Sequence, residues 1–208
     1  MSLVMADLKV LLIGGSSGVG KTVVAAQIAS QLGMTWGQVD DFRLVIERIT
    51  APEHQPALHA FFRNFDMLAP EELAQQYAAV ARVVSNAIEI VIANHVTTAA
   101  PIVLEGDTIL PEVAAQRVFA NLPVHNQVGA VFVVEPDAAW IMHNILARGR
   151  GTHKATQLKR RVQFSWLYGQ WLQQEAVQYG LPVLAARPQE TLSERILTAI
   201  QHISSGLM

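Results

Sequence analysis

The chain has 208 residues, of which 51% are apolar, with 15 Lys and Arg residues against 17 Asp and Glu residues and a formal net charge of −2. This length suits one α/β domain with a sizeable core and a small lid, and the low charge argues against a protein that coats nucleic acid or an anionic membrane. The absence of cysteine excludes disulfides and thiolate metal sites.

The first expected strand, residues 8–13, leads into the glycine-rich sequence Gly15-Ser16-Ser17-Gly18-Val19-Gly20-Lys21-Thr22, which a helix-compatible segment at 23–32 follows. This sequence matches every fixed position of the Walker A phosphate loop, in the strand-then-helix context that the motif requires. Glycines let backbone N–H groups wrap around a phosphate chain, and the helix N-terminus adds a favourable dipole. We expect Lys21 to reach the outer phosphates and the Thr22 hydroxyl to hold Mg²⁺. The loop therefore predicts binding of a nucleoside triphosphate with Mg²⁺.

The second expected strand, residues 35–39, ends next to Asp40 and Asp41, with Arg43 close behind. A carboxylate at this position can orient an acceptor hydroxyl or take its proton, and an arginine can bind an anionic acceptor. We favour this functional role for Asp40 over the alternative that it caps the next helix, although Asp is a favoured N-cap residue, and we favour neither role for Asp41. Arg43 also fits a helix surface.

A long helix is expected over residues 70–94, where apolar residues recur every three or four positions and Pro70 occupies the first turn. The third strand, residues 101–105, then ends in Glu105, followed by Gly106 and Asp107. An apolar strand that ends in an acid is typical of a Walker B element, which positions Mg²⁺. We favour Glu105 for the metal, because it lies at the strand end, and Asp107 for the acceptor.

The fourth expected strand, residues 129–134, precedes Asp137, which we expect to cap a helix. No acidic residue occurs between 138 and 174, a stretch that contains Arg148 and Arg150 beside flexible glycines and four further basic residues. A mobile cationic segment suits a phosphoryl-transfer lid, which we expect at about 148–160, with Arg148 and Arg150 closing over the phosphates. The alternatives are a solvated helix face or a nucleic-acid patch.

The fifth expected strand, residues 182–185, leads to Arg187, which is either part of the wall around the nucleotide base or a simple connector. Strands that alternate with helices predict a mainly parallel sheet covered on both faces. We expect one domain over residues 1–208. No signal peptide or membrane span is expected, which favours a cytoplasmic protein, either a monomer or a homodimer.

The phosphate loop, the Asp40-Asp41-Phe42-Arg43 run and the Val103-Leu104-Glu105-Gly106 run with Pro111 together resemble the 2-phosphoglycerate kinase-like branch of the P-loop kinases. More broadly, the chain is similar to the nucleoside and shikimate kinase group. The resemblance implies a P-loop NTPase three-layer sandwich, with a five-stranded parallel sheet in the order 2-3-1-4-5 and a helical lid. It also implies ATP and Mg²⁺ as cofactors, with Asp40 on the acceptor side and Glu105 near the metal.

The chain departs from this family at Glu105-Gly106-Asp107-Thr108, where 2-phosphoglycerate kinases tend to have Glu-Gly-Val-His. A basic residue is lost and an acid is added, which favours a polyol, sugar or nucleoside acceptor over an anionic one. The leading hypothesis is ATP-dependent phosphoryl transfer to a hydroxyl of a small molecule. The alternatives are an ATPase switch acting on a protein partner and a kinase acting on nucleic-acid ends, although we expect no nucleic-acid partner.

Overall fold

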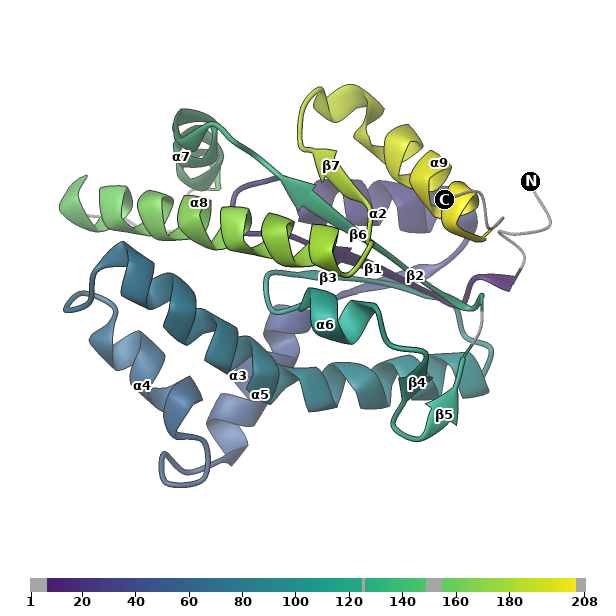
Figure 1. Cartoon of the computed structure of the whole chain (residues 1–208), viewed down its shortest axis with the longest axis horizontal. Coiled ribbons are helices and arrows are strands. Elements are labelled where there is room, and N and C mark those ends of the chain that lie inside the picture. Colours follow the sequence, from purple (N-terminus) through teal and green to yellow (C-terminus); the bar gives the residue numbers. More distant parts are fainter. Residues whose placement is uncertain (1–6, 125, 149–154, 205–208) are drawn as a thin grey trace.

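A five-stranded parallel sheet lies at the centre of the computed structural model, which describes residues 7–124, 126–148 and 155–204 (Figure 1). The strand order is β2-β3-β1-β6-β7, which confirms the predicted order once the strands are counted within the sheet. The strands are β1 (Val10–Gly14), β2 (Thr35–Gln38), β3 (Ile102–Gly106), β6 (Val128–Val134) and β7 (Val183–Ala185).

Helices cover both faces of the sheet, because alternate residues of the buried strands point to opposite sides. Val10 and Leu12 of β1 pack in the core formed with α5 (Pro70–Thr97) and α8 (Ala155–Gln178). Their neighbours on β1 pack in the second core, formed with α2 (Lys21–Leu32) and α9 (Leu192–Ser204). This is the predicted three-layer sandwich.

The long helix α5 confirms the sequence prediction and is the main apolar support under the sheet. Pro70 occupies its first turn, and Glu72 accepts a 2.9 Å hydrogen bond from the backbone N–H of Ala69. By length and composition alone α5 is apolar enough to cross a membrane, yet its apolar stripe from Leu73 to Ile92 packs in the core. We therefore interpret α5 as a core helix.

The remaining elements extend from the ends of the sheet. They are α3 (Val39–Ile49), α4 (Pro56–Asn64), α6 (Pro111–Ala114), α7 (Ala138–Ala147), the 3-10 turn Gln189–Thr191, and an antiparallel hairpin of β4 (Val118–Phe119) and β5 (Leu122–Pro123). Figure 1 shows α4 beside α5, in the same part of the molecule as the left-hand end of α8. The hairpin was not predicted, because its turn uses Ala120 and Asn121 at positive φ without a glycine signal.

The region predicted as a lid, about 148–160, is described only in part. Arg148 follows the last turn of α7, and residues 155–160 form the start of α8. Arg150 lies outside the described residues. Lid closure therefore stays a prediction.

Candidate active site

The phosphate loop connects β1 to α2 at the carboxyl end of the sheet. Gly15 has φ +146°, and a Cβ built there would lie 2.3 Å from the backbone oxygen of Val133, so only glycine fits this approach. Lys21 is 5% exposed, and its Nζ donates a 2.8 Å hydrogen bond to the backbone oxygen of Ser16. The loop thus curls around the lysine ammonium, which is the arrangement expected of a phosphate cradle.

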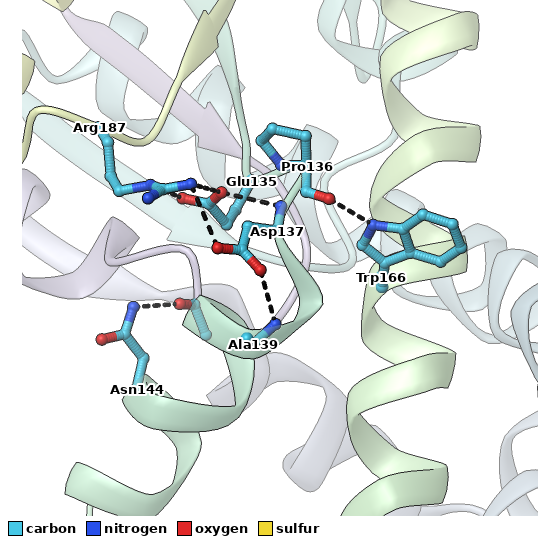
Figure 2. Close-up of polar contacts among 8 residues, drawn as sticks. Glu135, Pro136, Asp137, Ala139, Asn144, Trp166 and Arg187 are labelled. Atoms are coloured by element: carbon cyan, nitrogen blue, oxygen red, sulfur yellow. Dashed lines mark hydrogen bonds and ion pairs between the residues drawn. The ribbon is translucent and has the colours of Figure 1, made fainter.

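Two helices from the second half of the chain hold this loop from outside. Asn144 of α7 donates a 2.7 Å hydrogen bond to the backbone oxygen of Gly18 (Figure 2). Ser165 of α8 donates a 2.6 Å hydrogen bond to the backbone oxygen of Ser17. One turn further along α8, a Cβ at Gly169 would lie 2.7 Å from the Ser16 hydroxyl oxygen, so the helix and the loop are in close contact. No sequence signal identified these contacts, because they join residues that lie more than a hundred positions apart.

A hydroxyl and a carboxylate meet at the predicted metal site. The Thr22 hydroxyl donates a 2.8 Å hydrogen bond to Glu105, which is the second-last residue of β3 and is 4% exposed. Across the described residues, no group of three or more His, Cys, Asp or Glu side chains is arranged to hold a metal. Mg²⁺ usually needs only one or two protein oxygens, with nucleotide phosphates and water completing its octahedron. Thr22 and Glu105 fit that requirement.

Asp40 and Asp107 form a carboxylate pair beside the phosphate loop. The negative charge of Asp107, followed by burial, raises the pKa of Asp40 to about 7, against the opposing effect of Lys21 and Arg43. Asp40 lies in the first turn of α3, where the N-cap residue is Gln38, so the alternative that Asp40 is the N-cap of this helix is wrong. The predicted strand at 35–39 ends one residue early, because Val39 already begins α3.

Two buried tyrosines fix Asp107 in this pair. The Tyr77 hydroxyl donates a 2.9 Å hydrogen bond to Asp107 Oδ1, and the Tyr168 hydroxyl donates a 2.8 Å bond to the backbone oxygen of the same residue. Burial, followed by the charge of Asp107, raises the pKa of each tyrosine well above its ordinary value, so both remain donors. Sequence reasoning missed both residues, since Tyr77 was part of an ordinary helical stripe.

Two cavities meet at Asp40 and Asp107. The first, of about 280 Å³, contains the predicted phosphate and metal groups Lys21, Thr22 and Glu105, with Arg148 at its rim. The second, of about 440 Å³, extends from the same two carboxylates to Arg43, Arg161 and a group of aromatic rings. Ser17, Asp40 and Asp107 line both cavities. The arrangement can hold a phosphate chain on one side of the carboxylate pair and a small molecule on the other.

Of the other two residues predicted for the acceptor, one lines a cavity and one does not. Arg43 lines the larger cavity and forms a 2.9 Å ion pair with Glu47. Asp41 is exposed on α3 and is not among the residues that line either cavity. Its role in acceptor binding remains a prediction.

Arg187 follows β7 and is not among the residues that line either cavity. Its guanidinium donates two 2.8 Å hydrogen bonds to the buried carboxylate of Glu135, and Asp137 lies 3.6 Å away (Figure 2). These contacts raise the pKa of Arg187, mainly through the hydrogen bonds to Glu135. Asp137 accepts a 2.9 Å hydrogen bond from the backbone N–H of Ala139, which confirms its predicted role as a helix cap. Arg187 therefore ties β7 to β6, and its contact with the nucleotide remains a prediction.

Solved structures of small-molecule kinases share this fold. A sugar kinase from a Janibacter species matches with a TM-score of 0.56 and 17% identity, over 95% of this chain and 97% of that one. The shikimate kinase of Acinetobacter baumannii, solved with shikimate, matches with a TM-score of 0.55 and 15% identity, over 94% of each chain. With the phosphate loop and the sheet order, these likenesses show that the chain has the fold of the P-loop small-molecule kinases.

One similarity is more particular. A curated 2-phosphoglycerate kinase from Methanothermobacter thermautotrophicus is 26% identical over 187 residues, in a match that covers 84% of this chain. The match covers 60% of that relative's length. No protein-family model matches the chain.

Proposed function

We propose that the chain transfers the terminal phosphoryl group of ATP, with Mg²⁺, to a hydroxyl group of a small-molecule acceptor. The observation that carries this proposal is the meeting of two cavities at one carboxylate pair, with Lys21 and Thr22 on the phosphate side. The similarity to 2-phosphoglycerate kinase supports it. We take residues 1–208 as one cytoplasmic kinase domain, with Arg150 and Arg187 as further candidate nucleotide contacts.

The phosphate side of the site supplies positioning and charge. The Lys21 ammonium neutralises charge on the outer phosphates, and the loop N–H groups hold the phosphate chain. Thr22 and Glu105 would hold Mg²⁺, which supplies further charge neutralisation when bound. Arg148 lines this cavity, which supports a role for it in neutralising charge on the transferred group. Phosphoryl transfer needs little beyond such positioning and electrostatics.

Asp40 supplies the acid–base chemistry. In its ionised form its carboxylate accepts a hydrogen bond from the acceptor hydroxyl, and it takes the proton as the hydroxyl oxygen bonds to the terminal phosphorus and the bond from that phosphorus to the departing ADP oxygen breaks. A pKa of about 7 suits this role, because half of the groups are ionised at neutral pH and the carboxylate is more basic than usual. Asp107 lies beside it, where it can orient a second hydroxyl of the acceptor.

The experiment is ADP release with Mg-ATP across a panel of acceptors: phosphoglycerates, sugars, polyols, shikimate-like acids and nucleosides. Lys21→Ala is the control, because it removes the loop ammonium. Release that requires an acceptor and disappears in Lys21→Ala supports the kinase. Release that ignores every acceptor but still disappears in the variant favours the ATPase switch. Steeply salt-dependent binding of oligonucleotides favours the nucleic-acid end kinase.

A further inference from the structure

An aromatic wall lines the larger cavity on the side away from the phosphate loop. Its rings come from three helical segments that are separate in the sequence: Phe61 and Phe62 of α4 with Phe65 just beyond it, Tyr77 of α5, and Phe164 of α8. The ring centroids of Phe65 and Phe164 lie 5.8 Å apart at 86°, and Phe61 lies between 4.9 and 5.8 Å from each of its four aromatic neighbours. We call this set the aromatic wall.

Part of the aromatic wall is left uncovered by protein. Phe61 is 2% exposed and serves as its support, whereas Phe62 is 42% exposed and Phe65 is half-buried. The Arg43 guanidinium already lies 4.5 Å from the centroid of the Phe62 ring, so this ring accepts a flat group on its face. Exposed aromatic rings inside a cavity bind planar ligands by stacking.

The charges around the cavity disfavour an anionic acceptor. The carboxylates that line it are Asp40, Asp66 and Asp107, and the guanidinium groups are Arg43 and Arg161. Arg43 is in addition paired with Glu47 at 2.9 Å, which offsets its charge. A carboxylate or phosphate on the acceptor would therefore enter a lining in which acidic groups outnumber basic ones.

The end of the cavity next to the phosphates is built to accept hydrogen bonds from hydroxyl groups. Asp40 Oδ1 is buried and has no hydrogen-bond partner in the described part of the chain. Asp107 lies beside Asp40 and is held by Tyr77. Two adjacent carboxylates can accept hydrogen bonds from two hydroxyl groups of one ligand. The cavity volume, about 440 Å³, is within the usual range for a small-molecule site.

We propose that the acceptor is an uncharged compound in which a planar ring is joined to a hydroxylated group, the chemistry of a nucleoside. The planar ring stacks on the aromatic wall, while one hydroxyl lies at Asp40 and a second at Asp107. This inference rests on the proposed kinase function and narrows its substrate class.

The test compares kcat/KM for Mg-ATP-dependent phosphorylation of nucleosides, the sugars ribose and glucose, which carry no planar base, and the anions 2-phosphoglycerate, gluconate and shikimate. We expect nucleosides to exceed both other groups by about tenfold or more, since stacking of one base on an aromatic side chain supplies this much binding. Phe65→Leu keeps the apolar volume but removes the ring, and should raise the KM for the nucleoside by about tenfold. Phe65→Tyr keeps the ring and should retain most of the affinity, while the KM for ATP stays close to wild type in both variants.

The outcomes separate the two proposals. Turnover of an anion or of a sugar without a base that equals or exceeds turnover of nucleosides overturns the substrate class but leaves the kinase in place. Equal KM values in Phe65→Leu and Phe65→Tyr overturn the role of the aromatic wall. Absence of any acceptor-dependent ADP release that Lys21→Ala abolishes overturns the kinase itself, and the substrate class with it.

Discussion

The Thr22 hydroxyl donates a 2.8 Å hydrogen bond to Glu105 Oε1 and thereby joins the first turn of α2 to the last residues of β3. The two residues are 83 positions apart in the chain. The pair places a neutral and an anionic oxygen side by side at the edge of the phosphate cavity, which is the donor set that we assign to Mg²⁺.

Thr22→Val should raise the Mg²⁺ concentration needed for half-maximal ADP release by about tenfold or more, because it removes a metal ligand while keeping the side-chain shape. Thr22→Ser keeps the hydroxyl and should stay near wild type. Activity is measured in a Mg²⁺ titration at fixed ATP. Equal Mg²⁺ dependence in the two variants would exclude Thr22 as a ligand.

Lys21→Ala should lower acceptor-dependent kcat by about a hundredfold or more, since it removes a preorganised charge that stabilises the transferred group. Circular dichroism should show a folded protein. Lys9→Ala, a lysine at the start of the sheet outside both cavities, is the matched control. Comparable losses of kcat in Lys21→Ala and Lys9→Ala would indicate a folding defect rather than a catalytic role of Lys21.

The carboxylate pair predicts a pH-dependent stability. The pKa of Asp40 is about 7 in the folded state and 3.8 as a model value, so between these values the folded protein binds a proton that the unfolded chain does not. The free energy of unfolding should therefore fall as pH rises from about 4 to about 7. Asn at position 40 cannot ionise, so Asp40→Asn should have a higher free energy of unfolding than wild type at about pH 8 and a smaller advantage at about pH 5. Urea unfolding without nucleotide, at both pH values, measures this difference.

The same carboxylate pair predicts a pH-dependent activity. Wild-type kcat/KM should rise through an apparent pKa near 7, which belongs to the Asp40–Asp107 pair rather than to one residue. The assignment of this pKa to the Asp40–Asp107 pair would be contradicted by two results together. The free energy of unfolding would change with pH in the same way in wild type and Asp40→Asn, and wild-type kcat/KM would stay constant across neutral pH.

Tyr77→Phe removes the hydroxyl that donates to Asp107 and keeps the ring. We expect a loss of about 1–3 kcal/mol in the free energy of unfolding, the usual range for a buried hydrogen bond to a charged group. Tyr179→Phe, on an exposed tyrosine beyond α8, should change the stability little. Equal effects of the two substitutions on chemical denaturation would show that the Tyr77 hydroxyl does not hold Asp107.

Arg187→Ala should destabilise the fold, because the fully buried Glu135 carboxylate loses the two guanidinium hydrogen bonds and keeps the one from the backbone N–H of Asp137. Arg82→Ala removes a comparable arginine–glutamate pair whose partners are both exposed, and should cost less than about 1 kcal/mol. Thermal unfolding of the two variants provides the comparison. A larger drop in the unfolding temperature for Arg82→Ala than for Arg187→Ala would show that the contact between Arg187 and Glu135 contributes little to stability.

The sequence predicted the parts of this molecule that depend on local patterns. The phosphate loop, the five strands of the sheet and the long helix α5 follow from glycine spacing, short apolar runs and a period of three to four residues. Their order in the sheet came from the family resemblance. Strand ends were less well predicted, as with Val39, because strand and helix meet there without a turn residue.

The aromatic part of the larger cavity could not be predicted, because it is assembled from residues whose local patterns have ordinary explanations, whereas Asp40, Arg43 and Asp107 of the same cavity were predicted. Tyr77 and Phe164 fit ordinary helical core positions and Phe61 carries no sequence signal of a site, and the packing of α4, α5 and α8 brings their rings to one cavity. The hydrogen bonds of Asn144 and Ser165 to the phosphate loop likewise depend on tertiary structure alone.

The aromatic wall belongs to helices α4, α5 and α8, whereas the phosphate loop and Glu105 belong to the sheet and its first turn. Changes at Phe62 or Phe65 can therefore alter the choice of acceptor while the nucleotide side keeps its geometry. A directed-evolution library for new acceptors should be concentrated on Phe62 and Phe65, and it should leave Gly106 unchanged, where a Cβ would lie 2.0 Å from a Val39 methyl carbon. Acceptor recognition can therefore be changed at the aromatic wall without altering the residues that hold the nucleotide.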